Sequence, residues 1–141
     1  MKSAVFVDTG AFYALQVQGD RWHEAALRAF QTLMASSIRL FTSNLVVGET
    51  FTLLLIRHGR HAAWSFHDAV VRSKSIEIIH VSDEVENLAW TLLRRYADQP
   101  FSFVDGASFA LMRQKKITRA LAFDSHFAAA GFIRVPVDEP A

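Results

Sequence analysis

The feature that most constrains the fold is a continuous apolar run at residues 4–7 that ends at Asp8. Four consecutive apolar residues are typical of a strand that is covered on both faces, because a strand with one solvated face alternates apolar and polar residues. Strands of this kind occur in parallel sheets, whose neighbouring strands need long crossover connections that are usually helical. The run therefore predicts an α/β fold with helices on both faces of a parallel sheet.

The rest of the chain alternates between helical and strand-like patterns. Apolar residues recur at helical spacing over residues 10–17, from near residue 20, and over residues 44–58, 60–73, 83–96 and 103–115. Runs that are typical of strands lie at residues 39–42, 75–81, 119–123 and 132–135. Because strands separated by one or two helices imply crossover connections, the pattern predicts a three-layer α/β/α fold around an open parallel sheet.

Polar residues that can cap helices stand before four of the helical segments, namely Asp20, Ser43, Ser82 and Ser102. A side-chain oxygen at such a position accepts a hydrogen bond from one of the first free backbone N–H groups. These residues therefore predict where the helices begin.

Length and composition bound the class of protein. A chain of 141 residues with 51% hydrophobic content is expected to form a single domain over residues 1–141, with a short tail from about residue 136. The absence of cysteine excludes disulfides, thiolate zinc sites and thiol nucleophiles. The apolar run before Asp8 is too short for a secretory signal or for a membrane span of about 20 residues, so a cytoplasmic protein is expected.

Two aspartates follow predicted strands. Asp8 comes directly after the first strand and Asp124 directly after the strand at residues 119–123. In open parallel sheets, chemistry gathers at the carboxyl ends of the strands, so both side chains are expected at the same edge. Either aspartate alone could equally cap the turn that follows it.

A glutamate interrupts an apolar stripe on the helix predicted at residues 44–58. Leu45, Leu53 and Ile56 lie at helical spacing from Glu49 and define that stripe. A carboxylate buried among apolar side chains must be paired, protonated or bound to a cation. The alternative is a position at the edge of the stripe, where the carboxylate reaches water.

Asp105 shares a predicted helix face with Phe109 and Met112, which is again an apolar stripe. A structural alternative exists here too, because the spacing from Ser102 to Asp105 is that of a capping box with aspartate in place of glutamate.

Four carboxylates that meet at one edge of a sheet require cations, because two unit charges about 4 Å apart repel by roughly 4 kcal/mol at an effective dielectric constant near 20. A set of oxygen ligands without cysteine favours a hard ion, Mg²⁺ or Mn²⁺. A hydrated divalent ion held by carboxylates is suited to phosphodiester hydrolysis.

The chain resembles the PIN-domain ribonucleases, and among them the VapC-type toxins of bacterial toxin–antitoxin pairs. The resemblance rests on four segments in order, VFVDTGAFYAL, SNLVVGETFTLL, FSFVDGASFALM and AFDSHFAAAGF. It implies that Asp8, Glu49, Asp105 and Asp124 form the catalytic and metal-binding quartet of an endoribonuclease that cleaves single-stranded RNA with Mg²⁺ or Mn²⁺. It also implies a homodimer and a small antitoxin that covers the active-site groove.

The chain departs from the family pattern at two positions. Ala122 stands where many relatives carry a hydroxyl residue, and Gly106 follows Asp105 where alanine is common. Thr9 and Ser125 each follow an acid and offer hydroxyls instead, although capping of the next turn is the simpler role for both. His126 belongs to the last family-like segment, and packing or capping accounts for it without a catalytic role.

Other functions remain open at this point. One is a catalytically silent PIN-like interaction module whose acids serve as caps and ion pairs. Another is a phosphatase with an aspartyl nucleophile, which would want a second aspartate where this chain has Gly10. Two basic clusters, Arg57 to His61 and Arg113 to Arg119, are either RNA contacts or solvated helix ends.

The net charge of +1 conceals an uneven distribution. Without the four proposed site acids, ten acids stand against 15 basic residues, which leaves about +5 on the rest of the molecule. A compact acidic site within a moderately basic surface suits a protein that attracts RNA and holds divalent cations.

Overall fold

The computed structural model describes residues 3–141, and within them lies a five-stranded sheet in which all neighbouring strands are parallel. The strands are β1 (Ala4–Val7), β2 (Arg39–Ser43), β3 (Ile76–Ile79), β4 (Arg119–Ala122) and β5 (Ile133–Pro136). Their order is β3-β2-β1-β4-β5, so β1 is the central strand and the direction of succession reverses between β1 and β4. The prediction of an open parallel sheet is confirmed.

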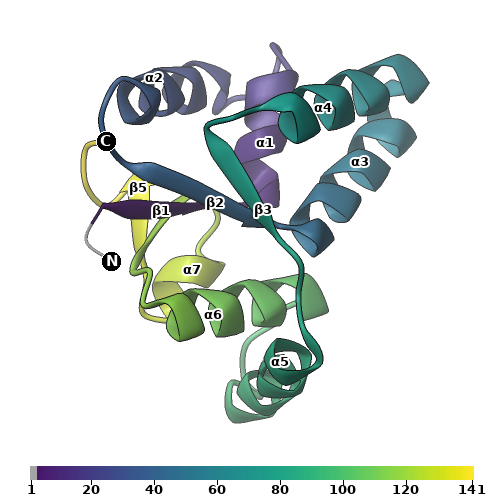
Figure 1. Cartoon of the computed structure of the whole chain (residues 1–141). Coiled ribbons are helices and arrows are strands. Elements are labelled where there is room, and N and C mark those ends of the chain that lie inside the picture. The colour runs from purple at the N-terminus through teal and green to yellow at the C-terminus, as the bar shows by residue number, and fades with distance from the viewer. Residues whose placement is uncertain (1–2) are drawn as a thin grey trace.

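Seven helices are present in residues 3–141, and they form two layers on either side of the sheet (Figure 1). One layer contains α1 (Thr9–Gln16), α2 (His23–Met34), α3 (Asn44–His58) and α4 (Arg60–Arg72). The other contains α6 (Phe103–Lys115) and α7 (His126–Ala129), with α5 (Asp83–Arg95) packed on α6 on the side away from the sheet. None of these helices is long and apolar enough to cross a membrane.

The core lies between the sheet and its two helical layers. All four residues of β1 are buried, as expected for a strand that is covered on both faces. The largest side chains in the core include Phe6 from β1, Phe109 from α6 and Phe127 from α7. Helix α6 is buried without a break from Gly106 to Met112, because it is sandwiched between the sheet and α5.

Three of the four predicted caps stand directly before their helices. The hydroxyls of Ser43, Ser82 and Ser102 each accept a hydrogen bond from a backbone N–H in the first turn. The prediction for Asp20 is wrong, because α2 begins at His23. The Asp20 carboxylate accepts a hydrogen bond from the backbone N–H of Trp22 at 2.9 Å and so closes the turn that precedes α2.

The chain beyond β5 is attached by ion pairs. Pro136, where the tail is expected to start, is the last residue of β5. Asp138 forms a bidentate ion pair with Arg134, and Glu139 pairs with Arg119. The final residues therefore lie against β4 and β5.

The close packing of α5 on α6 explains why this chain has Gly106 where alanine is common in the family. A Cβ atom at Gly106 would lie only 2.8 Å from Cγ of Leu93, and 3.1 Å from both of its Cδ atoms. The alanine that is common at this position in the family would therefore collide with a leucine on α5.

Replacement of Gly106 by alanine is expected to lower the free energy of unfolding by about 1–3 kcal/mol, because the added methyl group overpacks the contact between α5 and α6. Urea denaturation measures the change. In a Leu93→Ala background, the same substitution is expected to be neutral or stabilising, since alanine has the higher helix propensity. Equal destabilisation in both backgrounds would contradict this explanation.

Candidate active site

Asp8 lies at the carboxyl end of β1, beside the point where the strand order reverses. Its backbone N–H donates to the carbonyl of Leu121, which joins it to β4, and its own carbonyl accepts from Ala11 and Phe12 at the start of α1. The residue is only 4% exposed, and its side chain does not cap α1. The capping alternative for Asp8 is therefore wrong, and its carboxyl group is buried for another reason.

The three other predicted acids all lie close enough to Asp8 to affect its pKa. Burial is the largest cause that raises the pKa of Asp8 well above its ordinary value, and the negative charge of Asp124 is the next. The nearby backbone N–H of Thr9 lowers the pKa of Asp8 and so opposes this shift, whereas the charges of Asp105 and Glu49 raise the pKa further. An acid in this position is stabilised in its ionised form by a nearby cation.

Glu49 is held by the residue that follows Asp8. The hydroxyl of Thr9, the first residue of α1, donates to Oε1 of Glu49 on α3 at 2.6 Å. This corrects the capping role expected for Thr9, because its hydroxyl reaches across to another helix. A carboxylate with one oxygen fixed in this way has its second oxygen available for a ligand.

The apolar stripe around Glu49 lies at the edge of the core, which agrees with the second of the two alternatives given for this residue. The buried face of α3 consists of Val46, Thr50 and Leu54. Leu45 and Leu53 are half-buried, and Ile56 is 77% exposed. Together with Val104 of α6, the stripe lines an apolar groove that contains Glu49. Glu49 therefore stands at the edge of the stripe and reaches a surface groove.

Asp105 forms the capping box that its spacing predicts. Its backbone N–H donates to the hydroxyl of Ser102, and its Oδ2 accepts from the backbone N–H of Ser102, both at 3.0 Å. The same oxygen also accepts a hydrogen bond from Nδ1 of His126 at 2.8 Å. The structural role of Asp105 thus coexists with a place in the acidic cluster, because the carboxyl group has a second oxygen.

Asp124 is the exposed member of the cluster. It lies two residues beyond β4, and its Oδ1 accepts from the backbone N–H of His126 at the start of α7 at 3.0 Å. The hydroxyl of Ser125 makes no capping hydrogen bond to α7, so the expected capping role for Ser125 is wrong. Single ligand atoms of Asp105, Asp124 and His126 all lie within 4.8 Å of one another, which is close enough to share one metal ion.

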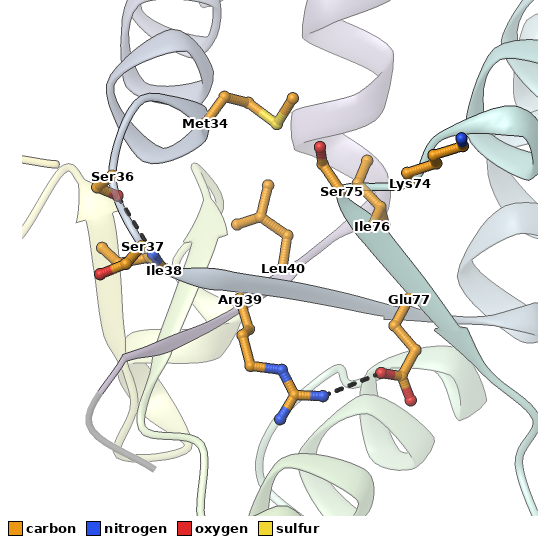
Figure 2. A pocket seen from close by; sticks show the side chains of 10 residues that line it. All are labelled: Met34, Ser36, Ser37, Ile38, Arg39, Leu40, Lys74, Ser75, Ile76 and Glu77. Atoms are coloured by element: carbon orange, nitrogen blue, oxygen red, sulfur yellow. Dashed lines mark hydrogen bonds and ion pairs between the residues drawn. The ribbon is translucent and has the colours of Figure 1, made fainter.

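The surface has another pocket at the amino-terminal edge of the sheet, opposite the acidic cluster. Figure 2 shows it at the amino-terminal ends of β2 and β3, where Arg39 pairs with Glu77 at 3.2 Å. Among the described residues that line it, Glu77 is the one acid, and it is already paired with Arg39. The carboxylates suited to metal binding therefore gather at the carboxyl edge of the sheet.

Four residues of the two basic clusters make contacts within the chain. Arg113 donates to the hydroxyl of Tyr96, and Arg119 pairs with Glu139. On the other side, the Tyr13 hydroxyl is hydrogen-bonded to His58, and the guanidinium of Arg57 lies over the ring of Tyr13. For these four residues, the contacts favour a structural role over RNA binding.

The fold and the acidic cluster together define a class of protein. The chain belongs to the PIN domain family, because the model of that family matches residues 5–133. The resemblance that the four sequence segments indicate is therefore confirmed.

Particular relatives agree with this assignment. The chain is 44% identical over 132 residues to the 23S rRNA-specific endonuclease VapC20 of Mycobacterium tuberculosis. The aligned region covers 93% of this chain and 97% of that protein. It is 28% identical over 127 residues to a VapC ribonuclease of Archaeoglobus fulgidus, with 89% and 80% covered. The crystal structure of VapC20, described as a toxin that cleaves the sarcin–ricin loop, matches with a TM-score of 0.85 and 42% identity over 93% of this chain and 98% of that chain.

Proposed function

We propose that this chain is an endoribonuclease that depends on Mg²⁺ or Mn²⁺, and that Asp8, Glu49, Asp105 and Asp124 hold the metal. The observation that carries the proposal is the buried carboxyl group of Asp8, whose pKa is raised by burial and by the three other acids. Oxygen ligands without a cysteine suit these hard ions. A bound ion of this kind supplies a Lewis acid for phosphodiester hydrolysis and lowers the pKa of water.

The side chains of the cluster have separate tasks in this mechanism. Asp8 supplies a buried charge at the bottom of the site, and Asp124 supplies an exposed one at its rim. The hydrogen bond from Thr9 fixes one oxygen of Glu49. Because these anchors are present before RNA binds, the site is oriented in advance and little reorganisation is needed during the reaction.

For the substrate, we propose single-stranded RNA in a loop of ribosomal RNA. The support is the identity of 44% to a 23S rRNA-specific endonuclease and the match to a structure described as a toxin that cleaves the sarcin–ricin loop. Single-stranded loops are recognised through their shape and through contacts to unstacked bases, which suits a protein without a strongly basic surface.

Primer extension on ribosomes treated with the purified protein tests this substrate. We expect one dominant new end in 23S rRNA, within the sarcin–ricin loop, and a 5′-phosphate on the downstream fragment. Purified transfer RNA under the same conditions serves as the comparison. Cleavage of transfer RNA with ribosomal RNA left intact would refute the proposed substrate.

We further propose that the chain acts in the cytoplasm as the toxin of a type II toxin–antitoxin pair and that a small antitoxin binds over the groove beside Glu49. The groove has an apolar lining from Leu45, Leu53 and Ile56, which suits an apolar segment of a partner. Its position would let a partner block access to the acids without altering the fold.

A homodimer is also proposed, and exposed aromatic side chains support it. Trp64 on α4 is 45% exposed and Trp90 on α5 is 50% exposed, so each offers apolar area that a second copy of the chain can cover. Light scattering coupled to gel filtration at micromolar concentration is expected to give twice the chain mass of 15.9 kDa. A single species of the chain mass over this range would refute the dimer.

A further inference from the structure

His126 is held rigidly next to the acidic cluster. It is the first residue of α7, and its backbone N–H is bonded to Asp124. Its ring packs edge-on against Phe101 with 5.4 Å between ring centroids, and Phe101 packs in turn against the buried Phe109. The side chain is 30% exposed, so most of the ring is enclosed. These contacts fix the direction in which the imidazole points.

The ring directs Nδ1 at one particular oxygen of Asp105. Because a carboxylate only accepts hydrogen bonds, the 2.8 Å contact between Nδ1 of His126 and Oδ2 of Asp105 has the proton on Nδ1. The backbone N–H of Ser102 donates to the same oxygen at 3.0 Å. Two donors therefore occupy Oδ2, whereas Oδ1 of Asp105 receives no hydrogen bond from the described part of the chain.

The geometry points to His126 as a positioning residue that fixes the Asp105 carboxylate so that Oδ1 is turned to the metal. This inference rests on the metal-dependent function proposed above. Without the imidazole, the carboxylate keeps only the bond from Ser102 and can rotate about its Cβ–Cγ bond. Hydrogen bonds that orient metal ligands typically account for a 10- to 100-fold change in metal affinity. Although His126 lies close enough to the cluster to share an ion, its Nδ1 carries the proton that bonds to Asp105 and has no lone pair for a metal, so it acts through Asp105.

Substitution of His126 by asparagine or by glutamine separates this role from simple packing. The amide nitrogen of asparagine lies where Nδ1 of histidine lies, and that of glutamine lies closer to the position of Nε2. His126→Asn therefore retains the donor to Asp105, whereas His126→Gln and His126→Ala remove it. His67→Ala is the matched control, because this histidine bonds to Asp68 and packs on Trp64 of α4.

Calorimetric titration with Mn²⁺ alone is the measurement. We expect the dissociation constant for Mn²⁺ to rise at least about tenfold in His126→Ala and His126→Gln, and to stay within about threefold of the parent in His126→Asn and His67→Ala. Equal affinity in the asparagine and glutamine variants would overturn the inference. Since these two variants carry the same functional group, the comparison holds even if the alanine variant fails to fold.

Pulsed electron paramagnetic resonance of the Mn²⁺-loaded parent provides a second readout. We expect no ¹⁴N coupling from a directly bound imidazole, and the appearance of such a coupling would overturn the positioning role. If the parent binds no Mn²⁺, the proposed function fails and the inference fails with it. If the parent binds Mn²⁺ and His126→Gln binds it equally well, the inference alone fails.

Discussion

Replacement of Asp8 by asparagine is expected to lower the rate of RNA cleavage at least about a hundredfold while raising the melting temperature of the metal-free protein. The rate falls because the variant loses a buried metal ligand, and the Lewis-acid contribution of a metal ion amounts to several kcal/mol. Stability rises because asparagine has nearly the same shape and carries no charge among three other acids. Cleavage by a folded Asp8→Asn protein at the parental rate would refute the proposed role.

The effect of this substitution on stability is expected to depend on pH. Burial and the neighbouring acids raise the pKa of Asp8 in the folded state. A carboxyl group of this kind binds its proton more tightly when folded, so the folded state loses stability as pH rises from the ordinary aspartate pKa through the raised value. The asparagine variant should therefore match the parent near pH 4 and exceed it at neutral pH.

Thermal unfolding in EDTA between pH 4 and pH 8 measures this difference. At neutral pH we expect the variant to melt roughly 2–6 °C higher, the range for the removal of one unfavourable group at a functional site. A control is Asp68→Asn, because Asp68 is exposed and lies outside the cluster. A variant that melts below the parent at pH 7 in EDTA would contradict the electrostatic explanation.

Removal of divalent metal is expected to abolish cleavage, and readdition of Mg²⁺ or Mn²⁺ is expected to restore it. An ion at 100 times its dissociation constant stabilises the folded state by about 2.7 kcal/mol, so Mn²⁺ should also raise the melting temperature of the parent by several degrees. This shift should vanish in Asp8→Asn. The combined loss is the largest single effect expected for this protein.

The same titration discriminates between the functions that the sequence leaves open. A silent interaction module would show no Mn²⁺-dependent stabilisation that Asp8→Asn removes. An aspartyl-nucleophile phosphatase would release phosphate from a phosphomonoester and leave RNA intact. RNA cleavage that persists in EDTA, with no further nuclease in the preparation, would refute metal dependence.

Periodicity and capping predict most of the fold because both are local. The run before Asp8 identifies the central strand, and the serines before α3, α5 and α6 mark where those helices begin. The start of α2 is missed because a cap signal does not distinguish a helix from the turn that precedes it. Asp20 satisfies the N–H of Trp22 in just such a turn.

The sequence predicts the candidate site only in part. The positions of Asp8 and Asp124 after strands indicate a shared edge, and the structure brings Glu49 and Asp105 to it as well. The hydrogen bonds from Thr9 to Glu49 and from His126 to Asp105 join residues 40 and 21 positions apart. Neither pair leaves a periodic signal, because each contact depends on how two elements meet in the folded chain.

The apolar stripe on α3 shows a limit of the same kind. Spacing correctly identifies a face of Leu45, Leu53 and Ile56, yet the core uses the neighbouring face with Val46, Thr50 and Leu54. Both faces are apolar enough to be buried. The arrangement of α6 beside the groove decides which one remains accessible, and this is a tertiary property.

The order of the strands also affects when the protein can become active during its synthesis. β1 is made first, yet one of its two neighbours in the sheet is β4, which ends at Ala122. Asp8 therefore meets Asp124 only after residue 124 has left the ribosome, and a nascent chain that still lacks β4 cannot assemble the four carboxylates. Under the function proposed above, the ribosome that makes this chain meets an assembled acidic cluster only after β4 has been synthesised.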